Sequence, residues 1–326
     1  MLCLVVPNLS SFTRWAQNAT TVAGLANGSV GSSLSSLNLD RGINIANDNT
    51  LYIADVLNNR VVAIGPNSTT AIAIIQNAPD STSLFAYPID VFVTQKYLYV
   101  SDMDNFRLVR LFKNGTDPVT FAGIQGIYGI SLNTSTISYC FNLFVDSNEN
   151  LYASDLDHHR VVRYPSNSSS GMPGVVIAGN GTSGTSASQL NGPYGIFVNE
   201  EGTLYVSDSS NHRIQRWNIG ASSGMTAAGT GVHGNRLSQL SYPTGIVVDS
   251  NGYMYIVDYG NNRIIRWAPN SSSGICIAAC TGTYGNDVDM LSTPFALAFD
   301  SYGSLFISDG SNNRVQKFQI LSSFGE

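Results

Sequence analysis

Charged side chains are scarce in this sequence of 326 residues, in which Asp, Glu, Lys and Arg together make up 12%. An ordinary soluble domain carries about a quarter. The formal net charge is −6, and no stretch gathers Lys or Arg into a cluster. Nucleic-acid binding depends on such clusters to neutralise phosphates, so the composition argues against a nucleic-acid partner.

Long apolar runs are also missing, and none approaches the roughly 20 residues that a membrane span requires. Residues 1–6 are apolar but short and lack a basic start, so we interpret them as the end of a signal peptide or as a truncated start. Asn-X-Ser/Thr sequons number nine, where chance gives about six for this composition, and the excess favours a secreted, extracellular glycoprotein. They lie at Asn8, Asn18, Asn27, Asn67, Asn114, Asn133, Asn167, Asn180 and Asn270.

Cysteine is rare as well, with only Cys3, Cys140, Cys276 and Cys280 in the chain. Cys276 and Cys280 lie four residues apart on a predicted strand, about 13 Å in extended chain. A disulfide needs Cα atoms within about 7 Å, so we expect these two not to pair unless a turn intervenes. A Cys140–Cys280 pairing is the alternative, and otherwise the cysteines act as small buried hydrophobes.

One motif, by contrast, occurs six times at intervals of 47 to 53 residues. Each copy, such as residues 204–214, reads as a β-run, an Asp-x-x-Asn-x-Arg turn and a second β-run, which predicts a hairpin. One acid and one guanidinium per copy at a fixed offset predict a ring of paired, partly buried charges with a structural role. The pairs are Asp55 and Arg60, Asp102 and Arg107, Asp155 and Arg160, Asp208 and Arg213, Asp258 and Arg263, and Asp309 and Arg314.

A further short apolar run precedes each hairpin and another follows it, which gives four strands per repeat. Four strands in each of six repeats predict an all-β fold, a six-bladed β-propeller of four-stranded antiparallel blades in one domain covering residues 1–326. The blades are predicted at 40–77, 86–123, 139–179, 192–229, 242–280 and 293–320, the last completed by 19–24.

The two ends of the chain are predicted to complete the same blade. The chain ends after a third strand and begins with an unpartnered outer strand, so residues 20–23 should close the ring beside residues 315–318. Arg14-Trp15 and Lys317-Phe318 then compete for one strand position. One of these pairs must lie outside the sheet, or the chain is cut from a longer array.

The repeat resembles the NHL-repeat family. The residues that carry the resemblance are Pro193-Tyr194-Gly195-Ile196, Leu204-Tyr205-Val206-Ser207-Asp208, Asn211-x-Arg213 and Trp217. The resemblance covers nearly the whole chain and implies a propeller, but propellers host many activities. Some members of the family bind RNA on a basic face or accompany ubiquitin-ligase modules, and this chain has neither a basic cluster nor a zinc-ligand module.

Two sets of residues are candidate metal ligands at the end of the channel where the inner strands begin. Asp90 and Asn142 replace small residues in adjacent blades and carry oxygen ligands suited to calcium; the alternative is that they bind channel water. His159, His212 and His233 lie in turns or loops on the same face and could ligate zinc; the alternative is that they are exposed turn residues.

The leading hypothesis is a non-catalytic binding scaffold that presents loops to a protein, peptide or glycan and requires no cofactor. Arg41, Tyr128, Tyr194 and Phe295 are the candidate contacts near the channel mouth. The alternative is a zinc- or calcium-dependent lyase or hydrolase that uses the channel. The chain resembles peptide-amidating lyases in its propeller, but no inner strand carries a histidine, and only Asp90 and Asn142 favour a lactonase-like calcium enzyme.

Overall fold

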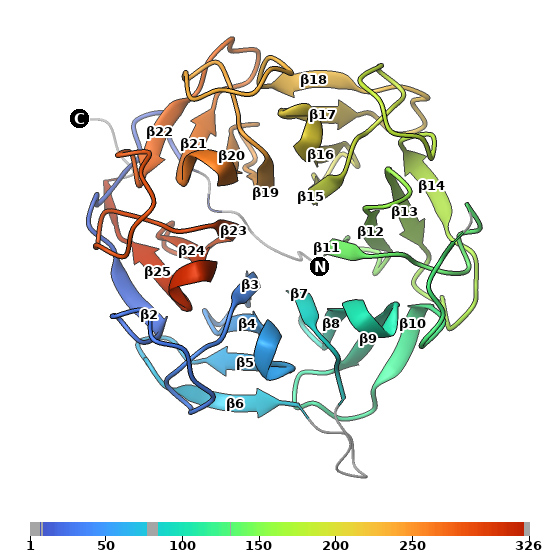
Figure 1. Cartoon of the computed structure of the whole chain (residues 1–326), viewed down its shortest axis with the longest axis horizontal. Helices are drawn as coiled ribbons and strands as arrows, with labels where there is room; N and C mark the ends of the chain where they lie inside the picture. The colour runs from blue at the N-terminus through green and yellow to red at the C-terminus, as the bar shows by residue number, and fades with distance from the viewer. Residues whose placement is uncertain (1–6, 8, 77–83, 131, 323–326) are drawn as a thin grey trace.

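Six four-stranded antiparallel sheets surround a central axis in the computed structural model, which describes residues 7, 9–76, 84–130 and 132–322 (Figure 1). The predicted fold class is confirmed. In the described part of the chain, no helix is long and apolar enough to cross a membrane. The innermost strands are β3 (Asp40–Ile45), β7 (Pro88–Val93), β11 (Cys140–Val145), β15 (Pro193–Val198), β19 (Pro243–Val248) and β23 (Pro294–Phe299).

The middle strands of each blade are buried on both faces, because neighbouring blades pack against each other. Their Leu, Val, Ile and Tyr residues form the core, while outer strands such as β14 and β18 run from exposed first residues to a buried last residue. From the second strand outward the blades comprise β4 (Leu51–Asp55), β5 (Arg60–Ile64) and β6 (Ala71–Ile75); β8 (Tyr97–Asp102), β9 (Arg107–Phe112) and β10 (Val119–Gly123); β12 (Leu151–Asp155), β13 (Arg160–Tyr164) and β14 (Val175–Ala178); β16 (Leu204–Asp208), β17 (Arg213–Trp217) and β18 (Met225–Ala228); β20 (Met254–Asp258), β21 (Arg263–Trp267) and β22 (Ile275–Ala278); β24 (Leu305–Asp309), β25 (Arg314–Phe318) and β2 (Thr20–Gly24).

The repeated turn joins the second and third strands through a dense set of hydrogen bonds. The Asp208 carboxylate accepts bonds from Arg213 Nε at 2.7 Å, Asn211 Nδ2 at 2.9 Å and the Asn191 backbone N–H at 2.7 Å. The Arg-to-Asp bond forms in all six blades, at 2.6 to 2.8 Å. The arginines also donate to carbonyls of the loop that enters the blade, so each pair fastens that loop to the turn.

Five of the six turns contain a single 3₁₀ turn followed by a residue in the left-handed conformation. In the third blade His158 stands where the others have Asn, and its Nδ1 lies 3.0 Å from Asp155 Oδ1. The one-turn helices are η1 (Val56–Asn58), η2 (Met103–Asn105), η3 (Ser209–Asn211), η4 (Tyr259–Asn261) and η5 (Gly310–Asn312).

The ring closes as the sequence predicted. Strand β2 pairs antiparallel with β25, and Thr20 lies opposite Lys317. Arg14–Trp15 forms a separate strand, β1, that pairs with β26 (Ile320–Ser322) in a two-stranded sheet. Lys317-Phe318 therefore keeps its place in β25, and Arg14-Trp15 is the pair that lies outside the blade.

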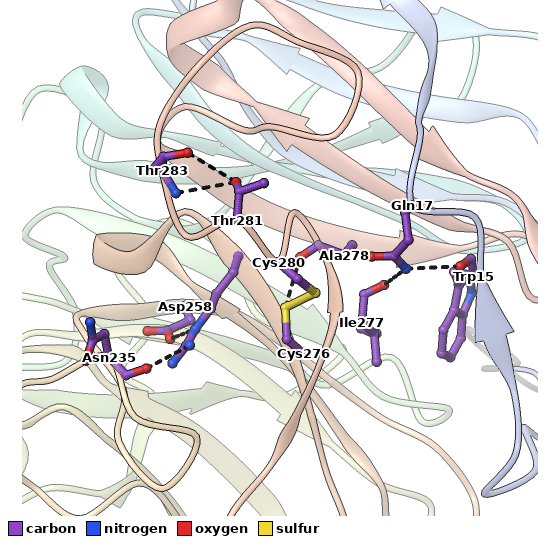
Figure 2. Close-up of a disulfide and its surroundings, with 11 residues drawn as sticks. Trp15, Gln17, Asn235, Asp258, Cys276, Ile277, Ala278, Cys280, Thr281 and Thr283 are labelled. Carbon is purple, nitrogen blue, oxygen red and sulfur yellow. Dashed lines mark hydrogen bonds and ion pairs between the residues drawn. A yellow bond between two sulfur atoms is a disulfide. The ribbon is translucent and has the colours of Figure 1, made fainter.

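The sequence predicts no pairing of Cys276 and Cys280 unless a turn intervenes, and the structure contains that turn. They form a disulfide with Cα atoms 5.7 Å apart (Figure 2). Strand β22 ends at Ala278, and Ala279 turns the chain through a left-handed φ of 52°, so the extended separation does not apply. Cys140 is a free, buried thiol, which excludes its pairing with Cys280. Cys3 lies outside the described residues, as do Asn8 and the apolar run at residues 1–6.

Candidate functional site

The second residue of each inner strand lies at the channel mouth, where these side chains surround a small cavity. Its free space of about 20 Å³ has room for roughly one water molecule. Glycines let the inner strands approach closely, since a Cβ on Gly195 would lie 2.1 Å from the Thr244 carbonyl oxygen. The lining residues are Arg41, Gly42, Ile89, Asp90, Phe141, Asn142, Tyr194, Gly195, Thr244, Gly245, Phe295 and Ala296.

Arg41 and three aromatic rings cover this cavity. The Arg41 guanidinium carbon lies 4.1 Å from the centroid of the Phe295 ring and 5.8 Å from that of Phe141. Tyr194 packs 4.4 Å from Phe141 and is stacked with Phe295 at 6.4 Å between centroids. We call these four residues the mouth cluster. Arg41 Nε is buried and has no hydrogen-bond partner among the described residues, so the cluster holds an unused donor.

The electrostatics of the mouth cluster keep the Tyr194 phenol protonated. Burial raises the pKa of Tyr194 to about 12, although the nearby Arg41 acts in the opposite direction. The phenol is therefore neutral at physiological pH and can donate and accept hydrogen bonds. Guanidinium–aromatic stacking of this kind stabilises the cation by about 0.5–2 kcal/mol, depending on its exposure.

Asp90 and Asn142 lie beneath the mouth cluster and join three adjacent blades. Asp90 Oδ2 accepts hydrogen bonds from Asn142 Nδ2 at 2.8 Å and from the Leu143 N–H at 2.9 Å. Asn142 Oδ1 accepts the Ile196 N–H at 2.8 Å. These bonds satisfy backbone donors on the edges of the inner strands, a need that any open sheet edge creates.

Burial raises the pKa of Asp90 to about 7, against the lowering effect of its hydrogen bonds to Leu143, Val91 and Asn142. Asp90 therefore changes charge near neutral pH. Both Asp90 and Asn142 line the cavity. Their side-chain oxygens are the ones that the sequence predicts as calcium ligands.

The three candidate zinc histidines do not converge. His212 and His233 pack with ring centroids 5.2 Å apart, whereas His159 hydrogen-bonds to the next blade. Nδ1 of His159 accepts the Gly192 N–H at 3.1 Å, and Nδ1 of His212 accepts the Tyr242 N–H at 3.2 Å. A neutral ring that accepts a hydrogen bond on Nδ1 carries its proton on Nε2. Neither ring nitrogen is then free to bind a metal.

Burial lowers the pKa of both His159 and His212, so the neutral form is favoured in each. Among the described residues, no group of three or more His, Cys, Asp or Glu side chains is placed to hold a metal ion.

Tyr128, a predicted contact, lies away from the cavity. Its hydroxyl donates to Asp157 Oδ2 at 2.6 Å, and this bond raises its pKa to about 12. Its ring packs against Phe106 and Tyr139. His212, His233 and Tyr242 form a second group of packed rings near the repeated turns.

Sequence reasoning missed Phe141 and Thr244. Both are the second residue of their inner strand, the position that Arg41, Tyr194 and Phe295 hold in theirs. This shared position is the signal that could have identified them. Cys140 replaces the usual proline in front of Phe141 and hides that register in the sequence.

The comparison with known families identifies the repeat. The NHL repeat model matches residues 190–217 and 240–267, which contain the hairpins of the fourth and fifth blades. No curated protein sequence matches the chain.

Several solved structures share the fold at low sequence identity. A Bacteroides thetaiotaomicron protein of unknown function has a TM-score of 0.70 at 17% identity, over 93% of this chain and 76% of that one. An auxiliary nutrient binding protein from Bacteroides ovatus has a TM-score of 0.68 at 14% identity, over 95% and 78%. A gluconolactonase from Xanthomonas campestris has a TM-score of 0.62 at 15% identity, over 98% and 100%. At these identities the similarity establishes the fold alone.

Proposed function

Since the chain is an NHL-repeat six-bladed β-propeller, we propose that it is a non-catalytic binding protein whose mouth cluster holds a glycan. The observation that carries the proposal is the Arg41–Phe295–Phe141–Tyr194 arrangement, with its unused Arg41 donor, over a cavity too small to enclose a metabolite.

A shallow aromatic surface suits a ligand whose flat faces pack on the rings and which is not enclosed by a pocket. Flat rings offer large contact area, while the phenol and guanidinium supply oriented hydrogen bonds. A sugar presents apolar C–H faces to such rings and hydroxyl or ring oxygens to a donor such as Arg41 Nε. The structurally similar nutrient binding protein from Bacteroides ovatus agrees with a ligand-binding role.

An extracellular location forms part of the proposal. The Cys276–Cys280 disulfide is typical of oxidising compartments. The eight sequon asparagines among the described residues are all exposed, as glycan attachment requires: Asn18, Asn27, Asn67, Asn114, Asn133, Asn167, Asn180 and Asn270.

The test is a glycan array probed with the labelled full chain. We expect selective binding that is lost in Phe295→Ala and retained in Tyr302→Ala, whose exposed ring lies in the turn between β23 and β24 at the opposite end of the blade. An array without selective binding, or equal loss in the two variants, would contradict the proposal. Binding of peptides alone at the same cluster would identify a peptide ligand instead.

A metal-dependent lyase or hydrolase is the second candidate, and the buried Asp90 beside the cavity is the observation that favours it. The similar gluconolactonase structure agrees with this alternative. Elemental analysis of the purified protein separates the two. Stoichiometric zinc or calcium that is lost in Asp90→Ala or His212→Ala would overturn the binding proposal.

A further inference from the structure

An amino-terminal segment is bound in a groove between the fifth and sixth blades. We call residues 9–17 the strap. Trp15 is buried, its indole N–H donates to the Gly303 carbonyl at 2.8 Å, and its ring lies 6.0 Å from that of Tyr255 and 6.2 Å from that of Phe299. The strap is therefore a peptide segment seated by an aromatic anchor.

Polar groups hold the strap backbone. The Arg266 guanidinium donates to the carbonyls of Ser10, Ser11 and Thr13. Asn251 Nδ2 donates to the Leu9 carbonyl at 3.1 Å.

At its other end the strap reaches the fifth blade through a side chain. Gln17 Nε2 donates to the Ile277 carbonyl at 3.4 Å (Figure 2). The strap thus shows which blade positions recognise a bound segment in this fold.

The neighbouring groove, between the fourth and fifth blades, has a volume of about 920 Å³ and repeats those positions. Tyr205 pairs with Arg216 across β16 and β17 as Tyr255 pairs with Arg266 across β20 and β21. The repeat likewise places Gly252, Val248, Ala227 and Glu201 where the strap groove has Gly303, Phe299, Ile277 and Asn251, and all six equivalents line the open groove.

Arg216 differs from Arg266 in what it binds. Arg266 donates to three carbonyls of the strap through Nη1 and Nη2. In Arg216 the buried Nε has no hydrogen-bond partner among the described residues. A guanidinium with an unsatisfied buried donor costs free energy that a bound acceptor would recover.

The open groove is also continuous with the strap interface. Asn251, which holds the Leu9 carbonyl, lines the open groove as well. Its counterpart Glu201 is exposed and, with its neighbour Glu200, makes this end of the groove acidic. A carboxylate can only accept hydrogen bonds, so Glu201 cannot donate to a backbone carbonyl as Asn251 does and instead favours a cationic group at the amino end of the segment.

We propose that this groove binds a peptide segment of a partner protein in the manner of the strap. The segment carries a tryptophan that packs on Tyr205 and donates to the Gly252 carbonyl. Its backbone carbonyls accept from Arg216, and a Lys or Arg at the amino end of the segment meets Glu201. This site lies at the end of the blades opposite the mouth cluster and is independent of the glycan proposal.

The test uses two fluorescein-labelled peptides, one with the strap sequence of residues 9–17 and one with that sequence preceded by a lysine. Fluorescence anisotropy with the full chain should give saturable binding, tighter for the lysine peptide. A Trp15→Ala change in the peptide should weaken binding at least about tenfold.

Variants of the protein locate the site. Arg216→Met should weaken binding about tenfold or more, while Arg163→Met, the matched arginine of β13 outside the groove, should leave it unchanged. Glu201→Gln should abolish the preference for the lysine peptide. Circular dichroism confirms that each variant is folded.

Three outcomes would overturn the proposal. The first is the absence of saturable binding at protein concentrations up to about 1 mM. The second is equal weakening by Arg216→Met and Arg163→Met. The third is self-association of the chain in sedimentation that Arg216→Met removes, because the occupant would then be a second copy.

Discussion

The Arg41 guanidinium carbon lies 4.1 Å from the centroid of the Phe295 ring, and this contact joins the first inner strand, β3, to the last, β23. Strand β23 belongs to the sixth blade, which β2 completes by pairing with β25, and β3 begins the first blade. The mouth cluster therefore joins side chains from both ends of the repeat array. A ligand that binds the cluster should, by mass action, also stabilise the closed ring.

The first prediction concerns the pH dependence of stability. An unfolded Asp titrates near pH 4, while burial raises the pKa of Asp90 to about 7 in the folded chain. Between these values the folded state binds a proton that the unfolded state does not. Asp90 therefore makes the free energy of unfolding fall as pH rises from about 4 to about 7, with no further loss above that.

Replacement of Asp90 by Asn should remove this contribution, since the amide oxygen can still accept from Leu143. Urea unfolding at pH 8 should show Asp90→Asn to be more stable than the wild type, by at most roughly 4 kcal/mol. At pH 4 the two should agree within about 1 kcal/mol. A variant that is less stable at pH 8 would show that the charged carboxylate is stabilised in the fold.

The second prediction concerns ring closure. Gly24 ends the closing strand β2 with a φ of +78°, and a Cβ there would lie 2.2 Å from the Asn313 carbonyl oxygen. Gly24→Ala should therefore destabilise the chain by about 2–4 kcal/mol more than Gly220→Ala. Gly220 is the matched control, because its φ is +72° but nothing lies within 4 Å. Equal melting temperatures for the two variants would argue against the close packing of Gly24 on the Asn313 carbonyl in the closing strand.

The third prediction concerns the disulfide. Cys276 and Cys280 enclose a short loop, and closing five residues removes about 2 kcal/mol of unfolded-state entropy in the chain-entropy model. Cys280→Ser should lower the free energy of unfolding by about that amount, and dithiothreitol should destabilise the wild type but not the variant. Mass spectrometry after alkylation should find these two thiols protected. Free thiols at both positions in the purified protein would refute the pairing.

The repeat made most of the fold predictable. Asp208 and Arg213 recur with five equivalents at even spacing, and this period implies both the number of blades and the closure by residues 20–23. The sequence separation of Cys276 and Cys280 could not reveal their disulfide. The pairing depends on one backbone angle, the left-handed φ of Ala279.

The candidate site was only partly predictable for a similar reason. Arg41, Tyr194 and Phe295 were found from their place at the channel mouth, but Phe141 follows a cysteine rather than the usual proline. Tyr128, also predicted at the mouth, does not line the cavity, and its hydroxyl donates to Asp157. The strap contact between Trp15 and Tyr255 joins residues far apart in sequence and departs from the repeat.

Isothermal titration calorimetry with the best glycan from the array tests the proposed function most directly. We expect one ligand per chain, an affinity that falls about tenfold or more in Arg41→Met and is unchanged in Tyr302→Ala, and ligand recovered intact by mass spectrometry. Binding that survives Arg41→Met, or conversion of the ligand during the titration, would contradict a non-catalytic site at the mouth cluster.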